Sequence, residues 1–461
     1  MVQRRKRLTS REPPMQALET IERPNHRELL KQRIIARTAR VGVIGIGFIG
    51  LPLAVAHAKA GFDVVGVDHD HIRVAQLTKG LNYLRDVRDD DLASAVASGK
   101  LTATTDFDSI RDFDVIVICV PTPVTASKDP DTSFVRRTGE LIAAQLLPGR
   151  LITLESTTYP GLTEDVLRPI FDSSGLKAGE DYFLAFSPVR SDPGNVELSA
   201  LNVNKIVGAL TPACLDVATT FYKQTIPEVI AVSSPKVAEI TKVFENTFRA
   251  VNIALVNELA LLCDKLGINV WEVIEASATK PYGIMRFDPG PGVGGHWIPL
   301  DPFYLAWAAR QHDFHLRFSE LAAEINILMP QFVREKVIRQ LNLGGKPMRD
   351  ANILLVGMAY KKNVDDWQES PALKCMYLFE ADQAIVTYHD PHVPSFRDRN
   401  GRLRHSVPLT PERLSAADCV CIMTDHDETD WDMITTHATS ILDSRNATRR
   451  VKHDREKIVL L

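Results

Sequence analysis

The feature that most constrains the fold is an apolar run that leads directly into a glycine-rich turn. Residues 41–46 are apolar, and Gly45, Gly47 and Gly50 follow the spacing G-x-G-x-x-G. A second apolar run ends at Asp68, about twenty residues after the first glycine, where such a unit carries the acid that binds a ribose. The glycines permit a tight turn and bring a pyrophosphate close to the next helix. Because Asp68 would repel a 2′-phosphate, the segment predicts a βαβ unit that binds NAD rather than NADP.

Length and composition describe an ordinary globular protein with more than one domain. A chain of 461 residues is too long for a single core. With a net charge of −4 and no apolar run of about 18 residues, it offers neither a basic field for nucleic acid nor a membrane span. The six cysteines lack zinc-like spacing, so we expect buried free thiols and no metal site. We therefore expect a cytoplasmic protein.

The first 39 residues stand apart from the rest of the chain. A basic run at residues 3–7 is not followed by an apolar segment, so it does not have the form of a secretory signal. We expect a solvated tail that leads into a short helix near Glu28–Ala36. A partner-binding role for the basic run is the alternative.

Apolar runs and helical stretches alternate again in the last quarter of the chain. Strands expected at 352–357, 385–390, 418–424 and 440–443 predict a second doubly wound sheet. Between the two sheets, no glycine or proline interrupts the chain from Pro235 to Leu266, which predicts one helix of about 45 Å. The expected fold is α/β, with two Rossmann-like doubly wound domains joined by a long central helix. Its expected parts are an N-terminal extension (1–39), an NAD-binding domain (40–232), a central helical domain (233–335) and a C-terminal Rossmann-like domain (345–461).

A second glycine-rich segment, residues 290–302, reads GPGVGGHWIPLDP. Four glycines in six residues let the backbone approach a phosphate or a sugar closely. The segment resembles the active-site loop of the nucleotide-sugar dehydrogenases, the UDP-glucose/GDP-mannose dehydrogenase family, which oxidise UDP-sugars twice at C6. In that family a cysteine follows Gly-Gly-His, and its thiolate carries the covalent intermediate. Here that position is Trp297.

The resemblance covers roughly residues 38–450 and is most specific at 251–262 and 290–305, which look like the bacterial UDP-N-acetylglucosamine 6-dehydrogenase branch. It implies that Lys242 and Asn246, four residues apart on one helix face, stabilise an oxyanion at C6 of the sugar. It also implies that Thr157 and Asp301 hold a catalytic water. From the residues alone, the first pair could lie on a solvated helix face, and Asp301 could cap the next helix.

The resemblance also implies binding residues, a UDP-sugar substrate and a homodimer or higher homo-oligomer built on the long helix. The strands expected at 115–120 and 151–154 end in segments that face cofactor and sugar in the family. The expected cofactor-binding residues are Gly45, Gly47, Phe48, Ile49, Gly50, Asp68, Arg73, Pro121, Thr122 and Glu155. The expected substrate-binding residues are Arg190, Arg249, Tyr282, Gly292, Gly294, Gly295 and Lys361.

Three departures from the family pattern fall in its functional segments. Trp297 replaces the cysteine, Val189 replaces the glutamate of Ser-Pro-Glu that helps turn over the thioester, and Gln368 replaces the arginine of Asp-Asp-x-Arg-Glu-Ser. Indole cannot act as the nucleophile because its only polar group is a donor N–H. The first two losses fall on the acyl half of the reaction, whereas the groups for hydride transfer are kept.

These departures lead to one main hypothesis and two alternatives. The main hypothesis is a single-hydride oxidoreductase on a UDP-sugar, most reasonably a UDP-N-acetylhexosamine, that stops at an aldehyde or ketone or returns the hydride and epimerises a carbinol. The first alternative is a conventional 6-dehydrogenase that forms a uronic acid with water in place of cysteine. The second is a catalytically silent protein that binds NAD and a UDP-sugar, a hypothesis that the lost charge at Gln368 favours.

Overall fold

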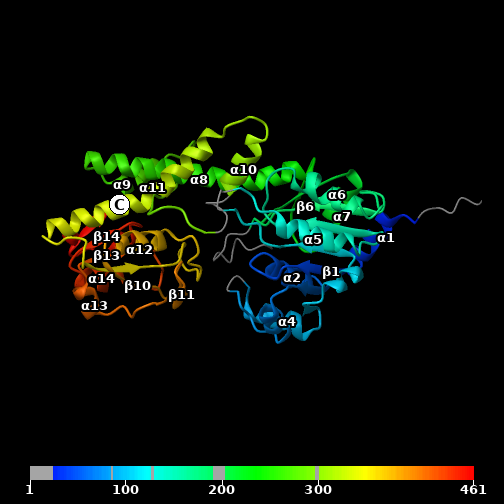
Figure 1. Ribbon diagram of the computed structural model, residues 1–461, viewed down its shortest axis with the longest axis horizontal. Coiled ribbons are helices and arrows are strands. Elements are labelled where there is room, and N and C mark those ends of the chain that lie inside the picture. The colour runs from blue at the N-terminus through cyan, green and yellow to red at the C-terminus, as the bar shows by residue number, and fades with distance from the viewer. Residues whose placement is uncertain (1–23, 85–86, 126–128, 191–202, 296–300) are drawn as a thin grey trace, which may run out of the picture.

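The computed structural model describes residues 24–84, 87–125, 129–190, 203–295 and 301–461. Figure 1 shows two α/β units side by side, with long helices running along one side of both. Each unit contains a sheet in which parallel strands dominate, and a helix of 32 residues runs between them. This arrangement confirms the expected fold class, whereas the expected domain limits stay a prediction.

The first sheet has eight strands in the order β3-β2-β1-β4-β5-β6-β7-β8. All neighbours from β3 to β6 pair in parallel, β7 runs antiparallel to β6, and β8 runs parallel to β7. The strands are β1 (Arg40–Ile44), β2 (Asp63–Val67), β3 (Leu101–Thr104), β4 (Val115–Ile118), β5 (Arg150–Leu154), β6 (Tyr182–Phe186), β7 (Lys205–Ala209) and β8 (Val229–Val232).

Helices cover both faces of this sheet, which explains why the central strands read as continuous apolar runs. Every residue of β4 and β6 is buried, and two hydrophobic clusters lie on opposite faces. The helices are α1 (His26–Ile35), α2 (Gly50–Lys59), α3 (His71–Thr78), α4 (Asp89–Ala97), η1 (Phe107–Asp112), α5 (Ser133–Ala143), η2 (Thr163–Leu167), α6 (Arg168–Asp172) and α7 (Pro212–Tyr222).

The N-terminal helix α1 is docked on the first unit, close to the position expected for it. Leu30 and Ile34, one turn apart, are buried in the core beneath it. Arg27 and Lys31 form ion pairs with Asp216 of α7. These contacts fix the start of the described chain to the end of the molecule remote from the second unit (Figure 1).

The long helix α8 spans Pro235–Leu266, as the sequence predicts. Ser234 caps its first turn through a side-chain oxygen that accepts from Val237 N, and Gly267 ends it with φ +68°, a left-handed conformation that favours glycine. The other helices of this layer are α9 (Val270–Ala278), α10 (Asp301–Arg310) and α11 (Arg317–Leu343), and both α10 and α11 pack on α8.

The second sheet has five parallel strands in the order β10-β9-β13-β14-β15. They are β9 (Asn352–Val356), β10 (Ile385–His389), β13 (Cys419–Ile422), β14 (Ile441–Asp443) and β15 (Ile458–Leu460), and β11 (Ser395–Arg397) and β12 (Leu403–His405) form a separate hairpin. The helices are α12 (Pro371–Ala381), α13 (Pro411–Ala416), α14 (Trp431–His437), η3 (Ala447–Arg450) and η4 (Arg455–Lys457).

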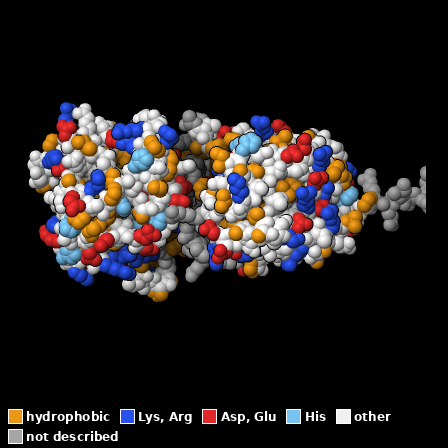
Figure 2. Space-filling model, turned by 90° about the horizontal axis from the view of Figure 1, so that it is seen from below, with side chains coloured by type: hydrophobic (Ala, Val, Ile, Leu, Met, Phe, Trp, Pro, Cys, Tyr) orange, Lys and Arg blue, Asp and Glu red, His pale blue; other side chains and the backbone are white. Residues whose placement is uncertain are grey.

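All six cysteines are buried free thiols, as expected. Over the described part of the chain, no helix is long and apolar enough to cross a membrane. Figure 2 shows two lobes side by side, with acidic and basic side chains mixed over the face in view.

Candidate functional site

The turn between β1 and α2 has the shape that a dinucleotide requires. Gly45 adopts φ +90°, and a Cβ on Gly50 would lie 1.8 Å from the Gly45 oxygen, so only glycine fits at Gly50. Ile49 supplies no side-chain cap to α2, so no side chain of the cap residue covers the positive end of this helix. Asp68 is 3% exposed, accepts from the Ile46 and Asp70 amides at 3.0 Å, and retains acceptor capacity for a ribose diol. These residues fit NAD.

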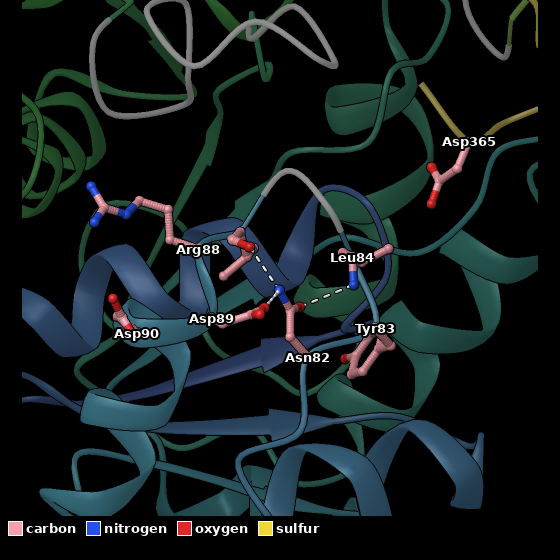
Figure 3. Close-up of a pocket in the computed structure, with 8 residues that line it drawn as sticks. Asn82, Tyr83, Leu84, Arg88, Asp89, Asp90 and Asp365 are labelled. Carbon is pink, nitrogen blue, oxygen red and sulfur yellow. Dashed lines mark hydrogen bonds between the residues drawn. The ribbon is translucent and has the colours of Figure 1, made fainter. Parts of the chain in front are cut away.

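A cavity of about 700 Å³ lies beside this turn. Its wall includes Asn82 and Tyr83, which follow α3, and Asp365 approaches from the second unit (Figure 3). The Tyr83 hydroxyl donates to the Ile46 oxygen at 2.8 Å, which ties this wall to the dinucleotide turn. The Asn82 amide donates to the Val87 oxygen at 2.7 Å and to Asp89 at 2.8 Å, which shapes the rim. The cavity thus adjoins the cofactor turn on the side that faces the second unit.

A lysine, an amide and an acid meet where α10 packs on α8. Lys242 and Asn246 are each 8% exposed, Asp301 is 1% exposed, and Asn246 Nδ2 donates to Asp301 Oδ2. Burial raises the pKa of Asp301 to about 7, although the Lys242 charge and the Asn246 hydrogen bond oppose the rise. Burial also lowers the pKa of Lys242, against the attraction of Asp301 and Glu245. The other oxygen of Asp301, Oδ1, is buried and has no hydrogen-bond partner among the described residues. The cluster can therefore take up and release a proton near neutral pH.

The loops that follow β4 and β5 are joined to each other and to α10. Thr122 Oγ1 donates to the Thr157 oxygen at 2.6 Å, and Ser156 Oγ donates to the Val120 oxygen at 2.6 Å. The Tyr304 hydroxyl of α10 donates to the Thr122 oxygen. Ligands of doubly wound sheets bind beyond these strand ends, so Thr122 and Thr157 lie at the expected edge.

The glycine-rich segment 290–295 is held between the helical layer and the second unit. The Gly290 amide donates to Asn257 Oδ1 at 2.9 Å, and Asn257 Nδ2 donates to Asn326 Oδ1 of α11 at 2.9 Å. Cβ atoms on Gly294 and Gly295 would each lie 2.8 Å from Tyr360. The glycines thus allow a close contact with protein, in addition to any contact with a ligand. His296 and Trp297 lie outside the described residues.

Other residues singled out from the sequence have definite neighbours. Glu155 is fully buried, and its two oxygens accept from Lys205 Nζ and the Tyr222 hydroxyl, so any role toward a cofactor rests on its backbone. Arg190 forms an ion pair with Glu245 at 2.7 Å, and Glu245 follows Lys242 by three residues in α8. Tyr282 is 72% exposed, with Lys280 over its ring. The assignments of all these residues stay predictions.

Val189 and Gln368, the other two departures from the family pattern, lie in very different surroundings. Val189 is 9% exposed and packs in the core of the first unit, whereas Gln368 is exposed in the loop before α12. An apolar side chain therefore occupies the position at which the family has its glutamate.

Several residues near the site were not identified from the sequence, chiefly Tyr83, Asn257, Tyr304, Trp307 and Tyr360. The Trp307 and Tyr159 rings lie 4.5 Å apart, which gives α10 a second contact with the first unit. The only sequence signal for Tyr304 and Trp307 is their three-residue spacing from Asp301, which places all three on adjoining helix faces.

Comparisons with known proteins agree with this geometry. Residues 39–226, 236–327 and 354–450 match, respectively, the NAD binding, central and UDP binding domains of the UDP-glucose/GDP-mannose dehydrogenase family. The chain is 33% identical over 413 residues to the UDP-N-acetyl-D-mannosamine dehydrogenase of Pyrococcus horikoshii (88% of this chain, 95% of the relative). It is also 33% identical to the UDP-N-acetyl-D-glucosamine 6-dehydrogenase of Pseudomonas aeruginosa (77% and 83%).

Solved structures give the same result. The Pyrococcus horikoshii UDP-D-ManNAc dehydrogenase superimposes with a TM-score of 0.82 at 31% identity, covering 91% of this chain and 98% of that one. The UDP-N-acetyl-mannosamine dehydrogenase Cap5O of Staphylococcus aureus gives 0.78 at 30% identity, covering 92% and 97%. The chain therefore belongs to the UDP-glucose/GDP-mannose dehydrogenase family and is an NAD-dependent, nucleotide-sugar dehydrogenase-like oxidoreductase.

Proposed function

We propose that this chain catalyses a single hydride transfer on a UDP-N-acetylhexosamine and forms no uronic acid. A carbinol of the sugar is oxidised to an aldehyde or ketone, or the hydride returns to the other face and the carbinol is epimerised. The observation that carries the proposal is the buried cluster of Lys242, Asn246 and Asp301, which is complete although a tryptophan stands at the family's cysteine position.

The cluster supplies what the hydride half requires from the protein. NAD, when bound, accepts the hydride. Asp301, with a pKa of about 7, takes the hydroxyl proton, directly or through one water. The Lys242 ammonium and the remaining N–H of Asn246 can donate to the oxygen as negative charge develops on it. One C–H bond and one O–H bond break, a carbonyl forms, and two electrons leave with the hydride.

The thioester half requires an accessible thiolate, and all six cysteines of the chain are buried. The cysteine nearest the cofactor turn is Cys119, which is 7% exposed, and burial raises the pKa of its thiol well above the usual value. Burial likewise raises the pKa of Cys375. Val189 in the core supports the same conclusion, because a carboxylate is missing where the family uses one to release the acid.

The substrate class rests on the match to a UDP binding domain and on the relatives, whose names include UDP-N-acetyl-D-mannosamine and UDP-N-acetyl-D-glucosamine dehydrogenases. We propose a UDP-sugar with a 2-acetamido group on this basis. Lys361 follows Tyr360, which contacts the glycine-rich segment, so it lies where the second unit meets the site.

We also propose that two copies of the chain associate through α8. The buried face of this helix carries Lys242 and Asn246, whereas exposed apolar side chains follow one another on its other face. They are Ile240, Phe244, Phe248, Leu255, Leu262 and Leu266. A stripe spaced by fours and sevens can pair with its own copy across a two-fold axis, as in the typical seam of paired helices.

The deciding experiment incubates the protein with NAD and UDP-N-acetylmannosamine, UDP-N-acetylglucosamine or UDP-glucose, and follows NADH and the mass of the sugar together. We expect a product two hydrogens lighter with one NADH per sugar, or an isomer of unchanged mass. A uronic acid with two NADH per sugar would overturn the proposal in favour of a conventional 6-dehydrogenase. Binding of both ligands without any conversion would identify a catalytically silent protein, and would overturn the proposal as well.

A further inference from the structure

Helix α10 carries three consecutive contacts at three-residue spacing. Asp301 meets Asn246 of α8, the Tyr304 hydroxyl donates to the Thr122 oxygen, and the Trp307 ring packs on Tyr159. The first contact lies in the helical layer, and the other two lie on the first unit. One rigid helix therefore joins the acid to the loops at the cofactor edge.

Hydrogen bonds connect Tyr304, through Thr122, to the loop that follows β5. Thr122 accepts from Tyr304 through its backbone oxygen and donates through Oγ1 to the Thr157 oxygen at 2.6 Å. A parallel bond from Ser156 Oγ to the Val120 oxygen fastens the same two loops together. Tyr304 is 2% exposed, and burial raises the pKa of its hydroxyl to about 12, so it stays a donor over the working pH range.

We propose that Tyr304 is a positioning residue that fixes the loops after β4 and β5 relative to Asp301. The inference rests on the proposed function, in which Asp301 and those loops act on one sugar carbon. Tyr304 touches no reacting atom. Its hydroxyl sets the separation between the proton acceptor on α10 and the strand ends where the cofactor binds, and a misplacement of about 1 Å in such a pair costs roughly a hundredfold in rate.

The test compares Tyr304→Phe with Tyr388→Phe, which is a matched control. The Tyr388 hydroxyl also donates to a backbone oxygen, that of Val393 at 3.1 Å, it is also 2% exposed, and its pKa is also raised by burial to about 12, but it lies in the second unit. Both variants lose one buried hydrogen bond, so we expect similar falls in melting temperature. Only Tyr304→Phe should loosen the site.

The first readout is amide hydrogen exchange of the ligand-free chain. In Tyr304→Phe we expect exchange over 120–124 and 156–159 to rise about fivefold or more, as the loss of one hydrogen bond implies. Tyr388→Phe should leave those segments unchanged. Thr122→Val removes only the hydrogen bond from Thr122 to the Thr157 oxygen, so it should raise amide exchange over 156–159. In the double variant with Tyr304→Phe, the increase in exchange should be smaller than the sum of the two single effects. Unchanged protection in Tyr304→Phe would overturn the proposal.

The second readout is kinetic. Tyr304→Phe should lower kcat about ten- to a hundredfold while the KM for the sugar changes less than threefold, and the pH limb near 7 should persist because Asp301 keeps its neighbours. The proposal would also be overturned if the pH profile of kcat in Tyr304→Phe were shifted from about 7, or if its kcat equalled that of Tyr388→Phe. If the unmodified chain converts no sugar, the proposed function fails, whereas hydrogen exchange still decides the role of Tyr304.

Discussion

Asn246 donates a side-chain hydrogen bond to Asp301 and so joins the middle of the long helix to the first residue of α10. The bond connects positions 55 residues apart in the chain and stabilises the ionised form of a buried carboxylate. The acidity of the site therefore depends on how the helical layer packs.

This relationship predicts the pH dependence of turnover. Asp301 accepts a proton only when ionised, so kcat should rise with pH through a limb near 7. Asn246→Ala removes an interaction that lowers this pKa, and the limb should therefore move to higher pH. A pH profile of kcat for both proteins measures the shift. Asn252→Ala, which removes a solvent-facing amide of the same helix, should leave the limb in place, and a limb that stays fixed in Asn246→Ala would contradict the assignment.

The activity should not depend on any thiol of the native chain. Treatment with iodoacetamide, or the change Cys119→Ala, should alter the initial rate of NADH formation by less than about twofold, because all six thiols are buried and burial raises the pKa of the Cys119 thiol. Trp297→Cys provides the positive control, since a new thiol at the family's position should make the rate sensitive to the reagent. Inactivation of the native chain by alkylation would count against single-hydride chemistry.

The contact between Gly294 and the second unit should be intolerant of a methyl group. A Cβ there would lie 2.8 Å from the Tyr360 Cβ and 2.9 Å from the Glu369 oxygen, so the loop must shift. We expect Gly294→Ala to lower kcat/KM about a hundredfold or more. Gly344→Ala is the control, because its nearest neighbour would be 3.4 Å away, and it should behave as the native protein in the same assay.

The apolar stripe on α8 predicts the assembly state. Phe244→Glu and Leu255→Glu each place a charge in the proposed seam, and light scattering after gel filtration should show the mass falling from that of two chains to that of one. Leu403→Glu changes another exposed leucine, on the β11–β12 hairpin, and should leave the mass unchanged. A native chain that elutes as a monomer would exclude the proposed pairing.

The buried ion pair of Lys205 and Glu155 predicts a large effect on stability. Burial raises the pKa of Glu155 while Lys205 opposes the rise, so Lys205→Met leaves a carboxylate without its charge partner in the core. We expect a loss of about 3–5 kcal/mol in urea unfolding. Lys100→Met removes the exposed partner of Asp63 and should cost at most about 1 kcal/mol. Equal losses in the two variants would contradict this interpretation.

The sequence predicts those features that depend on residues close together in the chain. The dinucleotide turn is local, because Gly45, Gly50 and Asp68 define it within one βαβ unit, and α8 is a single uninterrupted run. The Tyr304 contact joins residues 182 positions apart, and no spacing rule connects them. The same holds for Lys205 and Glu155. Strand β8 was not among the strands expected, although its residues, Val-Ile-Ala-Val, are all apolar; it lies at the edge of the sheet, and its two central residues are exposed.

The contact of Tyr360 with Gly294 and Gly295 bears on the order in which the protein is made. The dinucleotide turn is complete once the ribosome has released the first sheet, long before residue 360 is translated. The glycine-rich segment, however, lacks the contact with Tyr360 until the second sheet has folded against it. A chain that ends before residue 360 would therefore contain the dinucleotide turn but lack the Tyr360 side of the glycine-rich segment.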